Sequence, residues 1–338
     1  MNIREAIEKL VNRADLSEAE TIDVMNQIMT GEATPLQVAS FLTALRMKGE
    51  TVDEITGAAR VMREKAHRVS IGSKMVLDTC GTGGDQKGTF NISTTSAFVV
   101  AGAGVNVAKH GNRSVSSQSG SADVLGALGV KIDAPKERVE ACIAKIGIGF
   151  LFAPLLHEAM KYAVQPRRDI GIRTVFNLLG PLTNPAMASH QLLGLYSGKL
   201  VGVIAHVLKN LGSVRAMVVH GLEGLDEISL CGPTQVAELR DGQVREYTIE
   251  PEALGLKKCP LEDLQGGTAE QGAAIVEGVL QGNKGPRREV VLLNSGAALY
   301  VSGTAATIQD GMRLAAESID SGKARQKLQR LVEMTNAG

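Results

Sequence analysis

The sequence is poor in aromatic residues and carries no net charge. It has no tryptophan, four tyrosines and six phenylalanines among 338 residues, and its 36 basic residues balance its 36 acidic ones. Nucleic-acid binding needs a basic field, and binding of single strands also needs aromatic rings on which bases can stack. Both nucleic-acid binding and attraction to an anionic membrane are therefore disfavoured, and any site for an anion must be local.

Cysteine and long apolar segments are also scarce. The four cysteines are widely spaced and form no C-x-x-C pair, so neither a disulfide framework nor a zinc site is expected. No apolar run reaches the length that spans a membrane, and residues 1–11 are charged and helix-patterned, unlike a signal peptide. We expect a soluble protein with reduced thiols, located in the cytoplasm.

Glycine, by contrast, is abundant. The chain has 38 glycines against ten prolines, and the glycines gather in short runs. Such runs are typical of turns that bring the backbone close to a ligand, and less typical of flexible linkers. The length allows one large domain or two unequal ones.

The order of the expected elements predicts the fold class. Ser17 with Glu20 and Thr51 with Glu54 match helix capping boxes, so the first seventy residues predict about four short helices. Beyond residue 75, short apolar strands alternate with helices, which indicates βαβ units and a mainly parallel sheet. We therefore predict an α/β protein with a small N-terminal helical domain (residues 1–72) and a larger α/β domain (residues 73–338). Strands are expected at residues 75–78, 105–108, 130–132, 150–152, 192–196, 216–220 and 290–294, with a hairpin over residues 236–249 that turns at Asp241-Gly242.

The strongest feature is the run Asp78-Thr79-Cys80-Gly81-Thr82-Gly83-Gly84-Asp85, whose glycine-rich part, residues 81–85, lies between an expected strand and an expected helix. The backbone N–H groups of such a turn and the following helix N-terminus form a cradle for phosphate. The spacing is not that of a P-loop, and glutamine at position 86 breaks a dinucleotide-binding match. For this run alone, a tight turn without any ligand is the competing interpretation.

Two neighbouring segments strengthen the prediction of an anion site. Asn91-Ile92-Ser93-Thr94-Thr95 places three hydroxyls and an amide at a helix N-terminus, and residues 109–117 combine two cations, one histidine and several hydroxyls. Because the carboxyl ends of neighbouring parallel strands open on one crevice, both segments should face a shared polyanion. A solvated polar loop is the alternative, but it would not require so many donors after two successive strands.

Two further groups of residues predict a metal site and a site for a carboxylate. Adjacent carboxylates at Asp226 and Glu227 suit Mg²⁺, which bridges to phosphate oxygens, although an isolated pair of this kind is usually just solvated. Arg167 can hold a carboxylate through two hydrogen bonds, or it can form a surface ion pair with Asp169. His157 by itself is more typical of a structural histidine, and no covalent nucleophile is evident.

Several blocks in the right order resemble the anthranilate phosphoribosyltransferase family, and the likeness covers nearly the whole chain. They are residues 81–85, 91–95, 109–117, 120–123, 151–154, 171–184 and 224–229. The resemblance implies transfer of the phosphoribosyl group of phosphoribosyl pyrophosphate (PRPP) to the amine of anthranilate, with release of pyrophosphate, in tryptophan biosynthesis. It also implies a nucleoside phosphorylase-like α/β domain, a helical domain joined in space by roughly residues 154–181, an active site between the domains, and a homodimer.

The resemblance also implies roles for individual residues. The expected PRPP contacts are Gly81, Gly84, Asp85, Thr89, Asn91, Ile92, Ser93, Thr94, Lys109, Asn112, Arg113, Ser117 and Ser121. The expected anthranilate contacts are Gly81, His110, Asn112, His157 and Arg167. Mg²⁺, the one expected cofactor, would be held by Ser93, Asp226 and Glu227. The chain departs from the usual family pattern at Gly126, at Glu158 and at Gln165-Pro166, and the last two bear on how His157 and Arg167 are placed.

Two alternatives stay open at this point. A nucleoside phosphorylase of related fold would bind free phosphate, but the paired acids argue against it because that reaction needs no divalent metal. A non-catalytic nucleic-acid-binding relative would need the basic surface that this sequence lacks. The sequence does not tell whether a separate glutamine amidotransferase binds the chain, although no such domain is fused to it.

Overall fold

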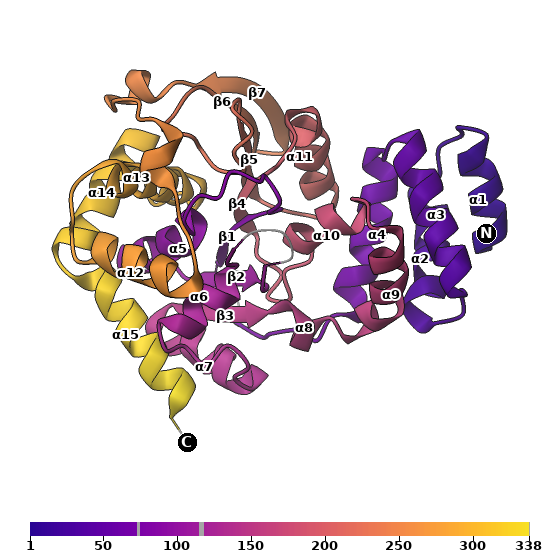
Figure 1. The fold of residues 1–338 in the computed structure, drawn as a ribbon, viewed down its shortest axis with the longest axis horizontal. Coiled ribbons are helices and arrows are strands. Elements are labelled where there is room, and N and C mark those ends of the chain that lie inside the picture. Colours follow the sequence, from indigo (N-terminus) through magenta and orange to yellow (C-terminus); the bar gives the residue numbers. More distant parts are fainter. Residues whose placement is uncertain (73–74, 115–117, 338) are drawn as a thin grey trace.

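The computed structural model describes residues 1–72, 75–114 and 118–337. A bundle of helices at the N-terminus lies beside a larger α/β domain built on one seven-stranded sheet (Figure 1). The predicted fold class is thus confirmed. Over the described ranges, no helix combines the length and apolar character needed to cross a bilayer.

The bundle is formed by four helices that each begin at a capping box. Ser17, Thr34 and Thr51 accept a hydrogen bond from the backbone three residues ahead, as the sequence predicts for the first and last, and Asn2 does the same for the first helix. The helices are α1 (Ile3–Val11), α2 (Glu18–Thr30), α3 (Pro35–Lys48) and α4 (Val52–Lys65).

Two helices from the middle of the chain pack on this bundle. Helix α9 (Lys161–Ile170) lies against α2 and α3, and α10 (Phe176–Leu182) lies against α4 (Figure 1). Ala163 and Phe176 belong to the same hydrophobic cluster as Phe41 of α3. The helical layer is therefore built from two segments that are far apart in the sequence.

The sheet has the strand order β3-β2-β1-β4-β5-β6-β7. Its first five strands are parallel, and β6 and β7 join antiparallel through the predicted hairpin at Asp241-Gly242. Both turn residues have a positive φ, as this type of two-residue turn requires. The strands are β1 (Leu77–Gly81), β2 (Val107–Gly111), β3 (Ile148–Phe152), β4 (His190–Gly194), β5 (Arg215–Gly221), β6 (Thr234–Arg240) and β7 (Gln243–Ile249).

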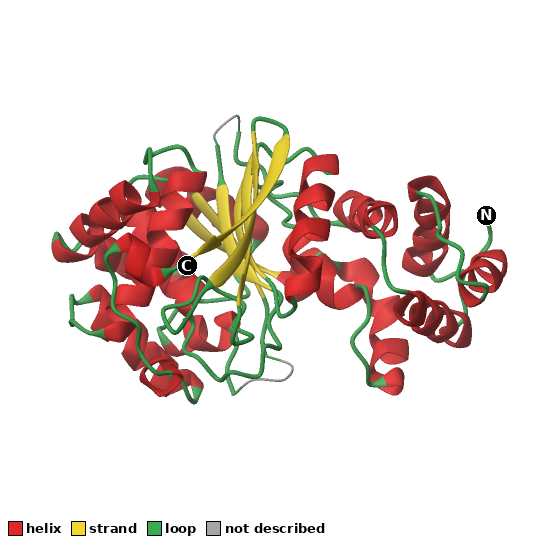
Figure 2. Ribbon diagram, turned by 90° about the horizontal axis from the view of Figure 1, so that it is seen from above, coloured by secondary structure: helices red, strands yellow, loops and turns green. Residues whose placement is uncertain are grey.

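Helices cover both faces of the sheet (Figure 2). Alternate residues of one strand serve the two faces: Leu192 of β4 packs with the C-terminal helices, whereas Leu193 packs with α11 and the helical bundle. One face thus shares a continuous hydrophobic core with the helical domain. The helices of the α/β domain are α5 (Ile92–Gly102), α6 (Ser121–Ala127), α7 (Lys136–Ile146), α8 (Ala153–Leu156), α11 (Val201–Asn210), α12 (Ala269–Leu280), α13 (Pro286–Val301), α14 (Ile308–Asp320) and α15 (Lys323–Asn336).

Two predicted strands are wrong. Residues 130–132 form no strand, because Val130 closes the end of α6 with a hydrogen bond to Leu125 and buries its side chain in the core. Residues 290–294 lie inside α13, since a short apolar run fits a buried helix as well as a strand. Pro286 in the first turn of α13 is the helix signal that this prediction overlooked.

Candidate active site

The site lies where the strand order reverses. The chain leaves β1 for β2 on one side, while β4 lies on the other side, so a crevice opens at the carboxyl ends of β1 and β4. The last residues of these strands, Gly81 and Gly194, are partners in the register. A Cβ atom on Gly194 would lie 1.6 Å from the carbonyl oxygen of Asp226, and one on Gly81 would lie 2.5 Å from its Oδ2. Gly194 is therefore required for the backbone of the Asp226 loop to enter the crevice, whereas a side chain at Gly81 would displace the Asp226 carboxylate.

The glycine-rich turn lies against the carboxylate of Asp226 and donates a hydrogen bond to it. Gly83 and Gly84 have φ values of 66° and 73°, and the non-glycine Gln86 also has a positive φ of 59°. The amide of Gly83 donates to Oδ2 of Asp226 at 2.7 Å. A backbone held in this left-handed conformation points amide groups toward an anion.

The second acid, Glu227, accepts a hydrogen bond at the N-terminus of α5. The amide of Ser93 donates to Oε1 of Glu227 at 3.0 Å, and the side chain of Asn91 does not cap the helix. Within the described chain, the buried atoms Oγ1 of Thr94 and Oδ2 of Asp85 have no hydrogen-bond partner. Buried polar atoms are rarely left unpaired, so these atoms suit a bound ligand or ion.

Lys109 connects the strands to this helix end. Its Nζ donates to the carbonyl of Thr79 at 2.6 Å and to Oγ of Ser93 at 3.3 Å. The side chain is buried, and burial lowers the pKa of its ammonium group. The geometry brings Lys109 and the polar start of α5 together, as the sequence predicts for two loops over one crevice.

Three carboxylates crowd the same place. Burial, followed by the neighbouring acids, raises the pKa of Asp226 and of Glu227, and Asp85 contributes to both shifts. A divalent cation would relieve this repulsion, and Mg²⁺ prefers oxygen ligands while keeping several waters or phosphate oxygens. These acids, like the other described His, Cys, Asp and Glu residues, are not arranged as a ready-made set of three metal ligands. The donor set therefore fits an ion that is shared with a phosphate-bearing substrate.

A second group of polar side chains includes two histidines. The rings of His110 and His157 lie 5.1 Å apart between centroids, and Nδ1 of His110 lies 3.1 Å from the carbonyl oxygen of Gly180. The Nε2 atoms of both rings are buried without a partner in the described chain. Burial, aided by the charge of the other ring, lowers the pKa of His110 to about 3, and burial lowers that of His157 to about 4. Both rings are thus neutral at pH 7.

Arg167 lies on α9, and its guanidinium stacks 5.2 Å above the ring centroid of Phe176. It is half-buried, burial lowers its pKa, and it forms no ion pair with any described residue. Asp169, the expected surface partner, instead accepts a hydrogen bond from Gln165 at 2.7 Å. The alternative prediction of a surface ion pair between Arg167 and Asp169 is therefore wrong. The Arg167 guanidinium is a partly buried cation that a ligand can contact.

The remaining predicted site residues that the structure describes contact other residues of the protein. Arg113 forms an ion pair with Asp123 at 2.9 Å, and Ser121 Oγ donates to the carbonyl of Asn112 at 3.3 Å. Thr89 pairs with Gln265 across an isolated bridge. The side chain of Ile92 is buried in the core, so only its backbone could touch a ligand, and Ser117 lies outside the described residues.

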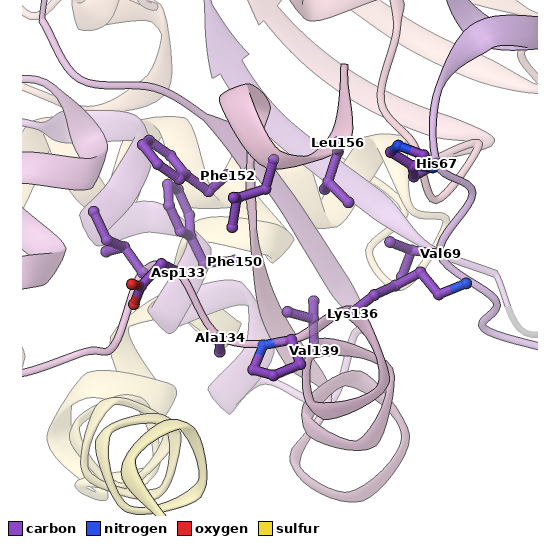
Figure 3. Close-up of a pocket in the computed structure, with 12 residues that line it drawn as sticks. His67, Val69, Asp133, Ala134, Lys136, Val139, Phe150, Phe152 and Leu156 are labelled. Atoms are coloured by element: carbon purple, nitrogen blue, oxygen red, sulfur yellow. The ribbon is translucent and has the colours of Figure 1, made fainter. Parts of the chain in front are cut away.

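A cavity of about 400 Å³ lies apart from these residues, between α7, α8 and the linker after α4 (Figure 3). Phe150, Phe152, Val139 and Leu156 give it apolar walls, and His67 lies at one side (Figure 3). None of the predicted site residues lines it. The polar crevice at β1 and β4 is the candidate active site, because the predicted site residues Ser93, Lys109, Asp226 and Glu227 meet there.

From the sequence, no ligand contact is predicted for two residues that shape the crevice, although one of them, Asp78, belongs to the run of residues 78–85 singled out above. Gly194 stands in no glycine run, and its importance comes only from its register with Gly81. Asp78 is fully buried below the site, where its carboxylate accepts from the amide of His110 at 3.3 Å and from Nδ2 of Asn184 at 2.8 Å. A charged residue within an apolar strand was the available signal for Asp78.

Comparison with known proteins agrees with this geometry. The model of the glycosyl transferase family a/b domain matches residues 73–325, and that of its helical bundle domain matches residues 4–66. Anthranilate phosphoribosyltransferase from Geotalea uraniireducens is 56% identical over an alignment that covers 99% of each chain.

Solved structures show the same likeness. The crystal structure of anthranilate phosphoribosyltransferase from Thermus thermophilus superposes with a TM-score of 0.93 at 45% identity, covering 98% of this chain and 99% of that one. The Saccharomyces cerevisiae enzyme in complex with PRPP and Mg gives a TM-score of 0.87 at 29% identity, covering 98% and 97%. These matches decide against the two alternative functions. The chain belongs to the anthranilate phosphoribosyltransferase family, which confirms the predicted transfer of the phosphoribosyl group of PRPP to anthranilate in tryptophan biosynthesis.

Proposed function

We propose that the crevice at β1 and β4 binds PRPP through its pyrophosphate, and that the glycine-rich turn, the start of α5 and Lys109 supply the donors. The observation that carries this proposal is the pair of hydrogen bonds from Gly83 to Asp226 and from Ser93 to Glu227. These bonds join the turn, the helix N-terminus and the acid pair into one small volume. The predicted PRPP contacts of Gly81, Gly84 and Thr94 belong to the same volume.

In this proposal Asp226 and Glu227 hold Mg²⁺, with Ser93 beside them. The crowded carboxylates and the unpaired oxygen of Asp85 support a cation at this position. Magnesium bound there would neutralise negative charge on the pyrophosphate as it departs.

The acceptor is proposed to lie toward His110, His157 and Arg167. Arg167 would hold the carboxylate of anthranilate through two parallel hydrogen bonds, and the two neutral imidazoles would contact the ring and amine. The amine nitrogen attacks C1 of the ribose, the bond from C1 to pyrophosphate breaks, and the nitrogen loses a proton. The chain contributes orientation and charge stabilisation, because this reaction requires no covalent intermediate on the protein.

The homodimer and the cytoplasmic location are also proposals. Leu36 and Met47 are 81% and 67% exposed on α3, and their spacing places them on one stripe of the helix. Val11, Tyr162 and Val164 on α1 and α9 are also exposed. We propose that this helical layer forms a homodimer contact, and that the protein acts in the cytoplasm, where its four free cysteines stay reduced.

The activity test uses the fluorescence of anthranilate, which is lost when its amine is ribosylated. Adding PRPP and Mg²⁺ together should abolish the signal, and omitting either one should preserve it. A signal that persists with both present would contradict the proposed function.

A further inference from the structure

Arg173 connects the acceptor side of the molecule to the glycine-rich turn. It lies in the segment between α9 and α10, and its guanidinium donates to the carbonyl oxygen of Gly84. The same guanidinium lies 4.2 Å above the ring centroid of Tyr196, which follows β4. The amide of Tyr196 in turn donates to Oγ1 of Thr82 at 3.1 Å. Arg173 is thus held between the turn and the end of β4.

We propose that Arg173 is a positioning residue for PRPP, which fixes the glycine-rich turn in the conformation that receives the pyrophosphate. This inference rests on the proposed role of the turn as the pyrophosphate cradle. Because a trans peptide is planar, holding the carbonyl of Gly84 also fixes the opposite direction of the Asp85 N–H. That N–H is one of the donors expected to face the pyrophosphate.

The turn needs such a contact because glycine adopts the left-handed conformation readily but is not confined to it. Gly83, Gly84 and Gln86 all lie in the left-handed region, and Gly83 and Gln86 are exposed. Gln86, the one non-glycine residue of the three, keeps this conformation because its surroundings hold it there. Asp226 holds the amide side of the turn at Gly83, and Arg173 holds the carbonyl side at Gly84.

Arg173 belongs to a different part of this segment from the proposed acceptor residue Arg167. Arg167, the proposed ligand of the anthranilate carboxylate, lies six residues earlier on α9, and α9 packs on the helical bundle. Replacing Arg173 therefore removes the contact with the glycine-rich turn and leaves the packing of α9 on the bundle in place.

The test compares Arg173→Met and Arg173→Lys with Arg168→Met, an exposed arginine in the last turn of α9. In Arg173→Met we expect the KM for PRPP to rise about tenfold or more, with the KM for anthranilate within about twofold of wild type. Arg173→Lys should recover part of the PRPP affinity, because it keeps the charge but loses the planar fork. Calorimetric titration of PRPP in the presence of Mg²⁺ should show the same order, and Arg168→Met should match wild type.

Hydrogen exchange adds a readout of the turn itself. The amides of residues 83–86 should exchange faster in Arg173→Met, while the melting temperature stays within about 2 °C of wild type. The inference is overturned if Arg173→Met keeps the wild-type KM for PRPP. It is also overturned if both KM values rise equally and the melting temperature falls, since that result indicates a purely structural role. If wild type itself neither binds PRPP with Mg²⁺ nor consumes anthranilate, the proposed function fails instead.

Discussion

The amide of Gly83 donates to the carboxylate of Asp226 at 2.7 Å, across 143 positions of sequence. The bond connects the turn after β1 with the loop after β5, at the crevice where the strand order reverses. It places a negative side chain inside a cradle of amide donors that suits an anion. The proposed Mg²⁺ would offset the negative charge of the carboxylate and of a bound pyrophosphate.

The close approach of Gly194 to Asp226 predicts a severe effect of a single methyl group. Gly194→Ala would place Cβ 1.6 Å from a carbonyl oxygen, so the loop of Asp226 must move. We expect the free energy of unfolding to fall by about 1–3 kcal/mol and the KM for PRPP to rise at least about tenfold. Denaturant titration and steady-state kinetics check both values.

Gly126→Ala is the matched control, because Gly126 is helical and has no atom within 4 Å of the added Cβ position. Its stability should stay constant or rise by up to about 1 kcal/mol. If Gly194→Ala behaves like this control, the crevice is not packed as described.

Removal of the Arg167 cation should affect one substrate far more than the other. In Arg167→Ala the carboxylate of anthranilate loses a charge-assisted pair of hydrogen bonds, which is worth about 1.5–3 kcal/mol. The KM for anthranilate should therefore rise by about tenfold to a hundredfold, with a much smaller change for PRPP. Initial-rate kinetics with each substrate varied in turn decides this, and an unchanged KM for anthranilate would remove the role of Arg167.

The buried histidines predict a loss of stability in acid. His110 and His157 have pKa values lowered to about 3 and about 4, whereas the unfolded chain takes up a proton near pH 6.5. The folded state therefore loses stability as the pH falls below about 6.5, by up to about 2 kcal/mol per histidine at pH 5.

Unfolding by denaturant at pH 7.5 and pH 5 measures this dependence. His157→Gln should reduce the difference between the two pH values, and the same substitution at the exposed His206 of α11 serves as the control. Equal pH dependence in wild type, variant and control would show that His157 is not held neutral.

The proposed dimer contact predicts a change of mass. Leu36→Glu with Met47→Glu places two charges on the exposed stripe of α3 and should convert a dimer into monomers, without lowering the stability of the helical bundle. Sedimentation or light scattering measures the mass of wild type and variant. A wild-type monomer, or a variant that stays dimeric, would contradict the proposed contact.

The sequence predicts local structure well where one short pattern determines it. Ser17 with Glu20 and Thr51 with Glu54 start helices, and Asp241-Gly242 forms the hairpin, because capping and turn geometry depend on neighbouring residues only. Residues 290–294 were misassigned because a run of only four apolar residues, 290–293, lacks the length that separates a buried strand from a helix.

For the site, the sequence could indicate which loops meet but not how closely they approach. Ser93 and the acid pair follow strands, and Lys109 lies near the end of one, and these strand ends share one edge, so the proximity of these residues could be predicted. The fit of Gly194 to Asp226 depends on strand register and on the path of a distant loop, and no local pattern encodes either.

The central claim is that Asp226 and Glu227 complete a magnesium-dependent pyrophosphate site in the glycine-rich turn. Calorimetric titration of PRPP into wild type and into Asp226→Asn with Glu227→Gln, with and without Mg²⁺, tests it directly. We expect Mg²⁺ to strengthen PRPP binding to wild type by about tenfold or more and to have almost no effect on the double variant. An equal Mg²⁺ dependence in both proteins would contradict the account.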